Sequence, residues 1–513
     1  MTRRKFLTYG ASAGLSLSLI GVRALEATAE VASNANDASA LGSSAISSFS
    51  AALQGSVIVP RDRSYEAARR VYSWNPITNK FPAMIVRCAV PADVIQAVNF
   101  ARANNLEVAV KGGAHDIQGS SVCGGGMVID LSPMKQIRID PDRRIAHVGA
   151  GATAGELNAA AHLHGMAACL GCDPGPGIAG VTLGGGMGWL TAKYGAACDN
   201  VLSMQIVTAD GQSQFADNQH NEDLFWGLRG GGGNFGIVTE FEYRLHPVRK
   251  IFGGFLAYPV SQARQFYKAY RDMMAEAPDE LVVETVSMAA FEGIPFKRPV
   301  VIAVVCYCGD PDDGDRILKP MRSSMRPIAD SIGMIPYVAL QRHPPLNVGR
   351  ALLGNRGVGD VAIRPLDRRL QYNHWKAASL GDLTDAAIDT LIECIEGAPK
   401  GWSIGMGHYV HGAVARVDPS ETAFIRRPGF SYFFEEDWFD PSEADPAMNW
   451  VDRSWDAMQP YSHLGTYVNF LSVPGDDAVK LTYGANYSRL ATLKRRYDPS
   501  NFFHLNRNIK PAT

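Results

Sequence analysis

The sequence predicts an α+β protein with more than one domain. Three features of its 513 residues support this. Between Pro82 and Pro247, short apolar runs typical of strands alternate with segments of helical periodicity. From residue 248 to 460 the glycine clusters thin out, aromatic residues increase, and strand and helix patterns mix. A compact tail then follows from Gly465 to Pro511.

The elements can be placed in order. Strands are expected over residues 83–90 and 106–110, and a helix opens at Pro91 between them. Thr153 and Glu156 have the spacing of a capping box, which predicts a helix that ends near Gly165. Further strands are expected over 201–212, 236–248, 304–308 and 407–417, and a last helix over 487–497.

The N-terminus predicts an export signal. Arg3 and Arg4 precede a modest apolar stretch, and Ala27-Thr28-Ala29 supplies small residues for cleavage, so residues 1–29 resemble a bacterial twin-arginine signal. A membrane anchor is the alternative, but the stretch is short and weakly apolar. Export to the periplasm or medium would involve the twin-arginine translocon, which carries folded proteins and so suggests a cofactor. Residues 30–64 read as a spacer with a short helix.

Charge and cysteine usage exclude other classes of protein. The net charge is −2 without a basic stripe, so a nucleic-acid partner is not expected. The eight cysteines show no zinc spacing, and the Cys169–Cys172 pair has no second pair beside it, so no metal site is expected. One or two disulfides would be compatible with an oxidising compartment.

Three glycine-rich tracts lie close together in the chain: KGGAHD (111–116), PGIAGVTLGGGMGWL (176–190) and LRGGGGNFGIVTE (228–240). None is a P-loop or a dinucleotide fingerprint. Glycine allows backbone to approach a ligand closely. Their clustering predicts loops that converge on one polyanion with backbone N–H groups turned toward it.

These tracts, with the tail YGANYSRLATLKRRYDPSNFFHLNRNIKP (483–511), resemble the FAD-linked oxidases that have a PCMH-type FAD-binding domain. Within this vanillyl-alcohol-oxidase superfamily, the berberine-bridge-enzyme-like branch is the nearest in pattern. The resemblance covers residues 65–250 and 460–511. It implies a two-part FAD domain, 65–247 and 461–513, with a substrate domain of antiparallel sheet and helices inserted at 248–460.

The resemblance implies covalent FAD. His115 stands where the family joins a histidine to the flavin 8α-methyl group; capping the turn or binding the pyrophosphate is the alternative role. A second bond, to the flavin 6-position, is considered for Cys172, although the family's cysteine position falls on Asp173. A free thiol or a disulfide is the alternative there. The other cofactor contacts implied are Lys111, Gly112, Gly113, Ala114, Asp116, Gly177, Gly180, Thr182, Gly184, Gly185, Gly186, Gly188, Trp189, Asn200, Gly236, Ile237, Val238, Asn469 and Asn508.

The tyrosine that often serves the family as catalytic base is absent from its expected position. Family members often have a tyrosine base directly after the tail's asparagine, but here that position is Phe470. If residues 467–470 form a strand, Tyr467 and Asn469 share one face and Phe470 faces away. Tyr467 then becomes the base, with Lys376 as the cation that favours its phenolate. His374, His408 and His411 are the other candidates, and Arg426 and Arg427 are expected to be rim or surface charges.

The expected function is an exported FAD-dependent oxidase or dehydrogenase. Its small-molecule substrate would be an alcohol, a sugar lactol or an amine, with hydride transfer to covalent FAD and O2 as the acceptor that yields H2O2. Two alternatives remain open. One is a wall-sugar reductase of the UDP-N-acetylenolpyruvoylglucosamine type, and the other is a flavin-binding protein without turnover.

Overall fold

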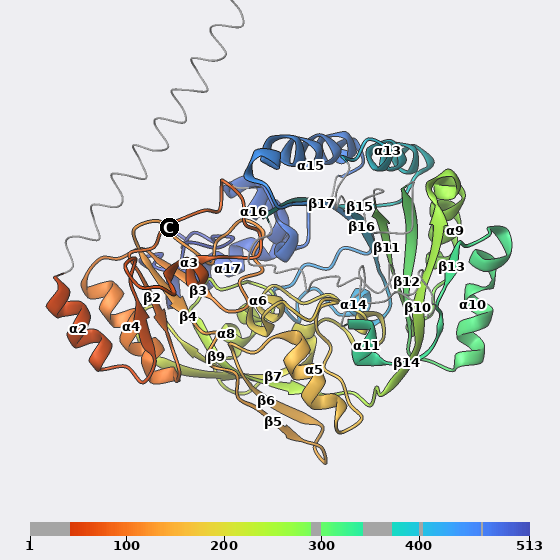
Figure 1. Ribbon diagram of the computed structural model, residues 1–513. Helices are drawn as coiled ribbons and strands as arrows, with labels where there is room; N and C mark the ends of the chain where they lie inside the picture. The colour runs from red at the N-terminus through yellow and green to blue at the C-terminus, as the bar shows by residue number, and fades with distance from the viewer. Residues whose placement is uncertain (1–41, 289–298, 342–371, 400–403, 463–464, 474) are drawn as a thin grey trace, which may run out of the picture.

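The computed structural model describes residues 42–288, 299–341, 372–399, 404–462, 465–473 and 475–513 (Figure 1). Three β-sheets with helices between and around them form this part of the chain. The expected α+β class is therefore confirmed. The expected signal, 1–29, lies outside the described residues. Within the described residues, no helix is both long and apolar enough to span a bilayer.

The first sheet has four strands in the order β1 (Ser56–Ile58), β2 (Met84–Arg87), β4 (Met127–Asp130) and β3 (Val108–Lys111). Strand β1 is antiparallel to β2, whereas β2, β4 and β3 are parallel, with the helix α4 (Pro91–Ala103) as a crossover. Asp93 in the first turn of α4 accepts hydrogen bonds from the N–H groups of Gln54 and Gly55. Residues 30–64 were expected to be a spacer with a short helix; the helix is present as α2 (Ser43–Ala51), and strand β1 of this sheet follows it within the same segment.

The second sheet has five antiparallel strands in the order β5 (Ile137–Asp140), β6 (Ile145–Gly149), β9 (Ile237–Arg244), β7 (Val201–Val207) and β8 (Ser213–Asp217). The expected capping box is present: Thr153 and Glu156 cap α5 (Ala154–His162). Helix α17 (Tyr487–Tyr497) begins and ends where predicted. Its residues Leu490 and Leu493 share a core with Leu224 of α8 (Glu222–Leu228), so the tail completes the first part of the chain.

The third sheet is the largest. Its strand order is β13 (Ala329–Asp330), β10 (Lys250–Pro259), β12 (Val300–Tyr307), β11 (Leu281–Met288), β16 (Ile404–Val410), β17 (Gly429–Trp438) and β15 (Tyr372–Gly381), and β14 (Gly333–Pro336) pairs with β10. All of its pairings are antiparallel. Four helices cover its outer face: α9 (Ala263–Ala275), α10 (Pro311–Ser324), α13 (Asp385–Glu396) and α15 (Ala444–Met458) (Figure 1).

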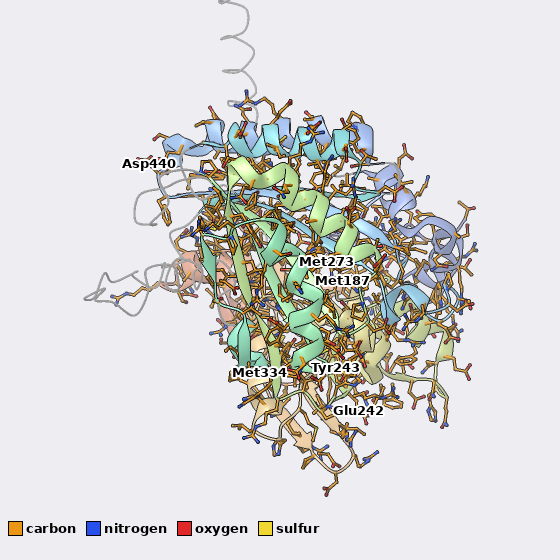
Figure 2. The ribbon with its side chains drawn as sticks, turned by 90° about the vertical axis from the view of Figure 1, so that its right-hand side faces the viewer. Met187, Glu242, Tyr243, Met273, Met334 and Asp440 are labelled. Atoms are coloured by element: carbon orange, nitrogen blue, oxygen red, sulfur yellow. The ribbon has the colours of Figure 1, made fainter. Side chains whose placement is uncertain are left out.

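The two faces of this sheet bury different sets of residues. Alternate residues of β11, β12 and β17 join Phe266 and Leu391 of the covering helices in one core. The intervening residues of β11 and β12 join Trp189 and Leu190 of the first part of the chain in another core. Figure 2 labels Met273, which lies on the covering helix α9, and Tyr243, which lies on β9 of the second sheet. We call the second face of the sheet the inner face.

Candidate active site

Two of the glycine tracts touch through their backbones. A Cβ placed on Gly113 would lie 2.1 Å from the Gly177 N atom, and one on Gly177 would lie 2.3 Å from the Gly113 N atom. Only glycine fits at both positions, because real Cβ contacts with backbone do not come this close. Ala114 adopts a φ of +58° directly before His115. The histidine is therefore presented from a tight turn pressed against the second tract.

Two neighbours define the position of the His115 ring. The ring of Tyr72 stacks on it, with centroids 4.3 Å apart and 13° between the planes. A Cβ on Gly175 would lie 2.8 Å from His115 Nε2, so the second tract passes directly beside this nitrogen. The Tyr72 hydroxyl donates to Glu435 Oε1 at 2.9 Å. Strand β17 of the large sheet is thereby linked to the histidine loop.

An ion pair fixes the other end of this loop. Asp116 accepts from the N–H groups of Gln118 and Ser120, at 3.0 and 2.8 Å, and pairs with Arg507 from the tail. Arg507 also donates to the Leu471 carbonyl at 2.8 Å. Burial opposes ionisation, but the Arg507 charge and the two amides outweigh it and hold the pKa of Asp116 below its usual value. Sequence reasoning named Asp116 but missed Arg507, although it lies in the NRNIKP tail motif.

We expect Asp116→Asn to destabilise the protein by about 3–5 kcal/mol at neutral pH, because it leaves Arg507 buried without its counter-charge. The lowered pKa gives the sign of the pH dependence. The contribution of Asp116 is present above its unfolded-state pKa and is lost as pH falls through its lower folded-state pKa. Denaturant unfolding of both proteins should therefore show a difference that shrinks toward strongly acidic pH. A difference that grows on acidification would contradict this assignment.

The tail segment around Asn469 forms the third wall of the site. It is not a strand as expected, because the Phe470 N–H bonds back to the Tyr467 carbonyl and closes the short 3-10 helix η8 (Val468–Phe470). The Tyr467 hydroxyl accepts from Gly186 N at 2.8 Å and from Asn469 Nδ2 at 2.7 Å. Phe470 does not face away: its ring centroid lies 5.0 Å from that of Tyr467.

This geometry argues against Tyr467 as the base. Burial raises the pKa of Tyr467 well above its usual value, which is the opposite of what a phenolate requires. Lys376 and His374 share the helix-covered face of β15, and both pair with Asp452 of α15, at 3.0 and 2.9 Å. The structure therefore does not bring Lys376 to Tyr467. Strand alternation puts Trp375, between the two, on the inner face.

We expect Tyr467→Phe to cost about 1–3 kcal/mol of stability, because it leaves the Gly186 N–H without its acceptor. Flavin reduction should stay within about tenfold of wild type, well short of the loss caused by removing a general base. Thermal unfolding and stopped-flow reduction measure the two effects. A loss of reduction rate on the order of 10²–10⁴ with unchanged stability would restore Tyr467 as the base.

The inner face of the large sheet contains a polar pair formed by Glu284 and His408. Strand register sets Glu284 of β11 directly across from His408 of β16, and His408 Nδ1 lies 2.9 Å from Glu284 Oε1. Burial, with Glu284 adding to it, raises the pKa of Cys172 well above its usual value. The sulfur is therefore held as a thiol, and a thiolate attack on a flavin ring is disfavoured.

His411 is not placed on the same strand as His408. The expected strand over 407–417 stops at Val410, because Gly412 turns the chain with a φ of +69° into α14 (Ala413–Arg416). A Cβ on Gly412 would lie 2.3 Å from the Ala192 carbonyl oxygen, so the turn packs tightly on α7 (Thr191–Tyr194). The His411 ring nitrogens lie 3.3 and 3.4 Å from the carbonyl oxygens of Tyr409 and Pro278, apart from the Glu284–His408 pair.

Comparison with known proteins identifies the family of the chain. An FAD binding domain model matches residues 82–215, and a berberine and berberine-like model matches residues 466–510. The chain is 30% identical to the uncharacterized FAD-linked oxidoreductase YvdP of Bacillus subtilis, over 90% of this chain and 99% of that protein. It belongs to the berberine-bridge-like family of FAD-linked oxidoreductases.

Two further relatives have named substrates. (R)-6-hydroxynicotine oxidase of Paenarthrobacter nicotinovorans is 30% identical, over 90% of this chain and 97% of that protein. The crystal structure of 6-hydroxy-D-nicotine oxidase from Arthrobacter nicotinovorans superposes with a TM-score of 0.78 at 28% identity, covering 90% of this chain and 99% of the other. The chain is thus an FAD-dependent enzyme with the fold of these oxidases.

The residues present fit FAD. Ser121 Oγ, in the histidine loop, and Asn508 Oδ1, in the tail, are buried and find no hydrogen-bond partner among the described residues. A Cβ on Gly180 would meet nothing within 4 Å, and one on Gly112 only the Ala150 carbonyl oxygen at 3.7 Å, so backbone is open at both places. Within the described ranges, no group of three His, Cys, Asp or Glu side chains is arranged to bind a metal ion.

At several other positions named for the cofactor, the side chain makes contacts inside the protein, and the cofactor contact stays a prediction. Thr182 Oγ1 lies 2.7 Å from the Tyr243 hydroxyl, and the indole of Trp189 donates to the Cys172 carbonyl. Asn200 donates to two carbonyls and lies 2.7 Å from His246 Nε2. Ile237 and Val238 lie in the core, and Lys111 donates to the carbonyls of Ala68 and Arg70. Through these hydrogen bonds and core contacts, the side chains stabilise the segments that carry them.

The glycines of the LGGGMG run also pack on protein. An added Cβ would meet Asn469 Oδ1 at 2.0 Å from Gly184, the Phe424 ring at 2.7 Å from Gly185, Ala197 Cβ at 2.3 Å from Gly186 and the Leu170 carbonyl oxygen at 1.9 Å from Gly188. At Gly236 it would meet the Val207 carbonyl oxygen at 2.5 Å. The tight approach at these positions is therefore between protein segments, and contact of each glycine's backbone with the cofactor stays a prediction.

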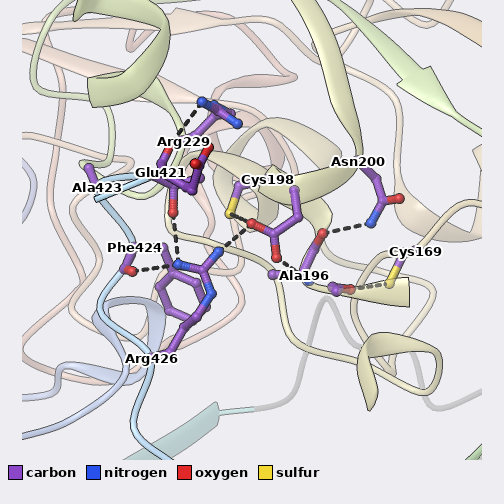
Figure 3. Close-up of polar contacts among 12 residues, drawn as sticks. Cys169, Ala196, Cys198, Asn200, Arg229, Glu421, Ala423, Phe424 and Arg426 are labelled. Atoms are coloured by element: carbon purple, nitrogen blue, oxygen red, sulfur yellow. Dashed lines mark hydrogen bonds and ion pairs between the residues drawn. The ribbon is translucent and has the colours of Figure 1, made fainter. Parts of the chain in front are cut away.

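Arg426 and Arg427 are not rim charges. Only 4% of the Arg426 side chain is exposed; it pairs with Asp199 and donates to Thr422 and to the Phe424 carbonyl (Figure 3). Arg427 donates to three backbone carbonyls, and burial lowers the pKa of Arg427 to about 10. Together these contacts fix the position of the segment in which the Phe424 ring packs against Gly185.

All eight cysteines of the chain are free thiols.

Proposed function

We propose that this FAD-linked oxidoreductase is an exported oxidase whose flavin is joined to His115. It oxidises an alcohol, a sugar lactol or an amine and passes the electrons to O2, which yields H2O2. When bound, the flavin supplies the hydride acceptor. The observation that supports this most directly is the position of His115, stacked on Tyr72 at the contact between two glycine tracts. The raised pKa of the Cys172 thiol favours a single covalent bond.

An aromatic cluster on the inner face favours a flat substrate. Trp375, Phe433 and Phe470 contact one another, with ring centroids 5.1–5.7 Å apart. Such rings bind apolar and cationic organic groups through their faces. The (R)-6-hydroxynicotine oxidase of Paenarthrobacter nicotinovorans is named for 6-hydroxynicotine, whereas similar folds at lower identity include a chitooligosaccharide oxidase. We therefore favour aromatic alcohols and cyclic amines over sugars.

An anaerobic screen of the yellow protein tests this function. Aromatic alcohols, cyclic amines and oligosaccharides are mixed with it in turn, and bleaching of the flavin is followed by stopped flow. Admission of air to a bleached sample should restore the colour and release peroxide. If NADPH bleaches the flavin and no alcohol or amine does, a reductase role is supported instead. A protein that stays oxidised with every compound would be a flavin binder without turnover.

Export is tested separately. Expression of the full chain in a bacterium should place the yellow protein in the periplasm or medium, and Arg3→Lys with Arg4→Lys should retain it in the cytoplasm. Unchanged distribution of the doubly substituted protein would exclude twin-arginine export.

A further inference from the structure

The Glu284–His408 pair has the arrangement of a carboxylate-backed imidazole. The Glu284 side chain is 2% exposed, that of His408 is 17% exposed, and the pair is set by direct opposition across strands β11 and β16. An ionised carboxylate only accepts hydrogen bonds, so the proton between the two belongs to His408 Nδ1. In the neutral ring, His408 Nε2 then has a free lone pair and can accept a proton.

His408 Nε2 is buried and has no hydrogen-bond partner among the described residues. A pair with a purely structural role would ordinarily satisfy both ring nitrogens, because a buried polar atom without a partner costs about 1–3 kcal/mol. The nearby indole nitrogen of Trp375 is in the same state. Two unsatisfied polar atoms at one aromatic cluster point to a ligand with hydrogen-bonding groups.

The surroundings of the imidazole connect it with the site. The His408 ring stacks on Phe470, with centroids 5.5 Å apart and 21° between the planes. Phe470 occupies the position where a tyrosine base is expected by resemblance, and it cannot take a proton. Phe470 in turn contacts Tyr467, whose hydroxyl is bound to Gly186 of the second glycine tract. The imidazole therefore packs directly against the ring that stands in place of the expected tyrosine base.

We propose that His408 is the catalytic base of this enzyme and that Glu284 is its positioning residue. The inference rests on the proposed function. The substrate loses the proton of its O–H or N–H bond to His408 Nε2, and the adjacent carbon loses a hydride to the bound flavin. A C=O or C=N bond forms in the substrate, the flavin when bound would supply the two-electron acceptor, and the Glu284 carboxylate balances the charge of the imidazolium. No further reactant is needed.

A phenol probe tests the proton acceptor without turnover. 4-Nitrophenol is titrated into the oxidised, flavin-loaded protein at a mildly acidic pH at which the free probe is neutral. The difference absorption spectrum then reports whether the bound probe is a phenol or a phenolate. Wild type should bind it as phenolate, His408→Gln as neutral phenol, and Glu284→Gln as a mixture.

The matched control is His220→Gln, the same change at a side chain that is 63% exposed; it should behave as wild type. The proposal is overturned if His408→Gln still binds phenolate or if wild type does not bind the probe. If His408→Gln does not yield yellow protein, Glu284→Gln gives the answer, because it keeps the imidazole but should lose part of the phenolate band.

Flavin reduction provides the second test, with any substrate that bleaches wild type. His408→Gln should slow reduction by about 10²–10⁴-fold with normal flavin content, and added imidazole should restore the rate of His408→Ala in proportion to its concentration. Wild-type rates in His408→Gln, or no rescue of a yellow His408→Ala protein, would refute the base. Failure of every substrate on wild type would refute the proposed oxidase function and leave the phenol result standing.

Discussion

His115→Ala should lose all of its acid-stable flavin. The His115 imidazole is held between the Tyr72 ring and the backbone of Gly175, and the resemblance assigns the covalent bond to this side chain. The alanine variant should still fold, because His115 is only partly buried and its loop is anchored by the Asp116–Arg507 pair. Precipitation with acid should leave wild-type protein yellow and the variant colourless, and flavin should map to the peptide that contains His115.

Cys172→Ser is the matched control for this prediction. Burial holds the pKa of Cys172 well above its usual value and so disfavours the thiolate that a flavin bond requires, so loss of the thiol should leave the acid-stable colour with the protein. Two flavin-linked peptides in wild type would instead show a second bond at Cys172. Acid-stable flavin in His115→Ala would show that another residue forms the bond and would overturn the assignment.

Gly113→Val should abolish FAD loading and destabilise the protein strongly. Overpacking usually costs about 1–3 kcal/mol, and here the clash is with backbone rather than with a side chain that can turn aside. The new Cβ would lie 2.1 Å from Gly177 N and 2.7 Å from Gly177 Cα, so the two tracts would have to separate. The measurements are the ratio of flavin to protein absorbance and the midpoint of denaturant unfolding.

Gly124→Val tests whether the effect comes from that contact. Gly124 lies in the loop that follows, it is exposed, and an added Cβ would meet nothing within 4 Å. This variant should load FAD and unfold like wild type. Normal loading in Gly113→Val, or an equal loss in Gly124→Val, would show that close contact between the tracts is not required.

The sequence by itself determined the fold class, the FAD motifs and the elements with strong local signals. Thr153 and Glu156 cap α5 as predicted, and α17 spans Tyr487–Tyr497, because caps and helical periodicity act within a few residues. The glycines at 113 and 177 were also recognisable, since a backbone that must touch another backbone excludes every other residue type.

The tertiary structure alone decided which side chains meet. Asp116 and Arg507 are 391 positions apart, and Glu284 and His408 are 124 apart. The register of β11 against β16 set the second pair, and a slip of one residue would turn His408 to the helix-covered face. Lys376 failed as a partner of Tyr467 for the same reason, because strand alternation sends it to Asp452. Local patterns contain no information about such long-range register, which only the packing of the whole sheet defines.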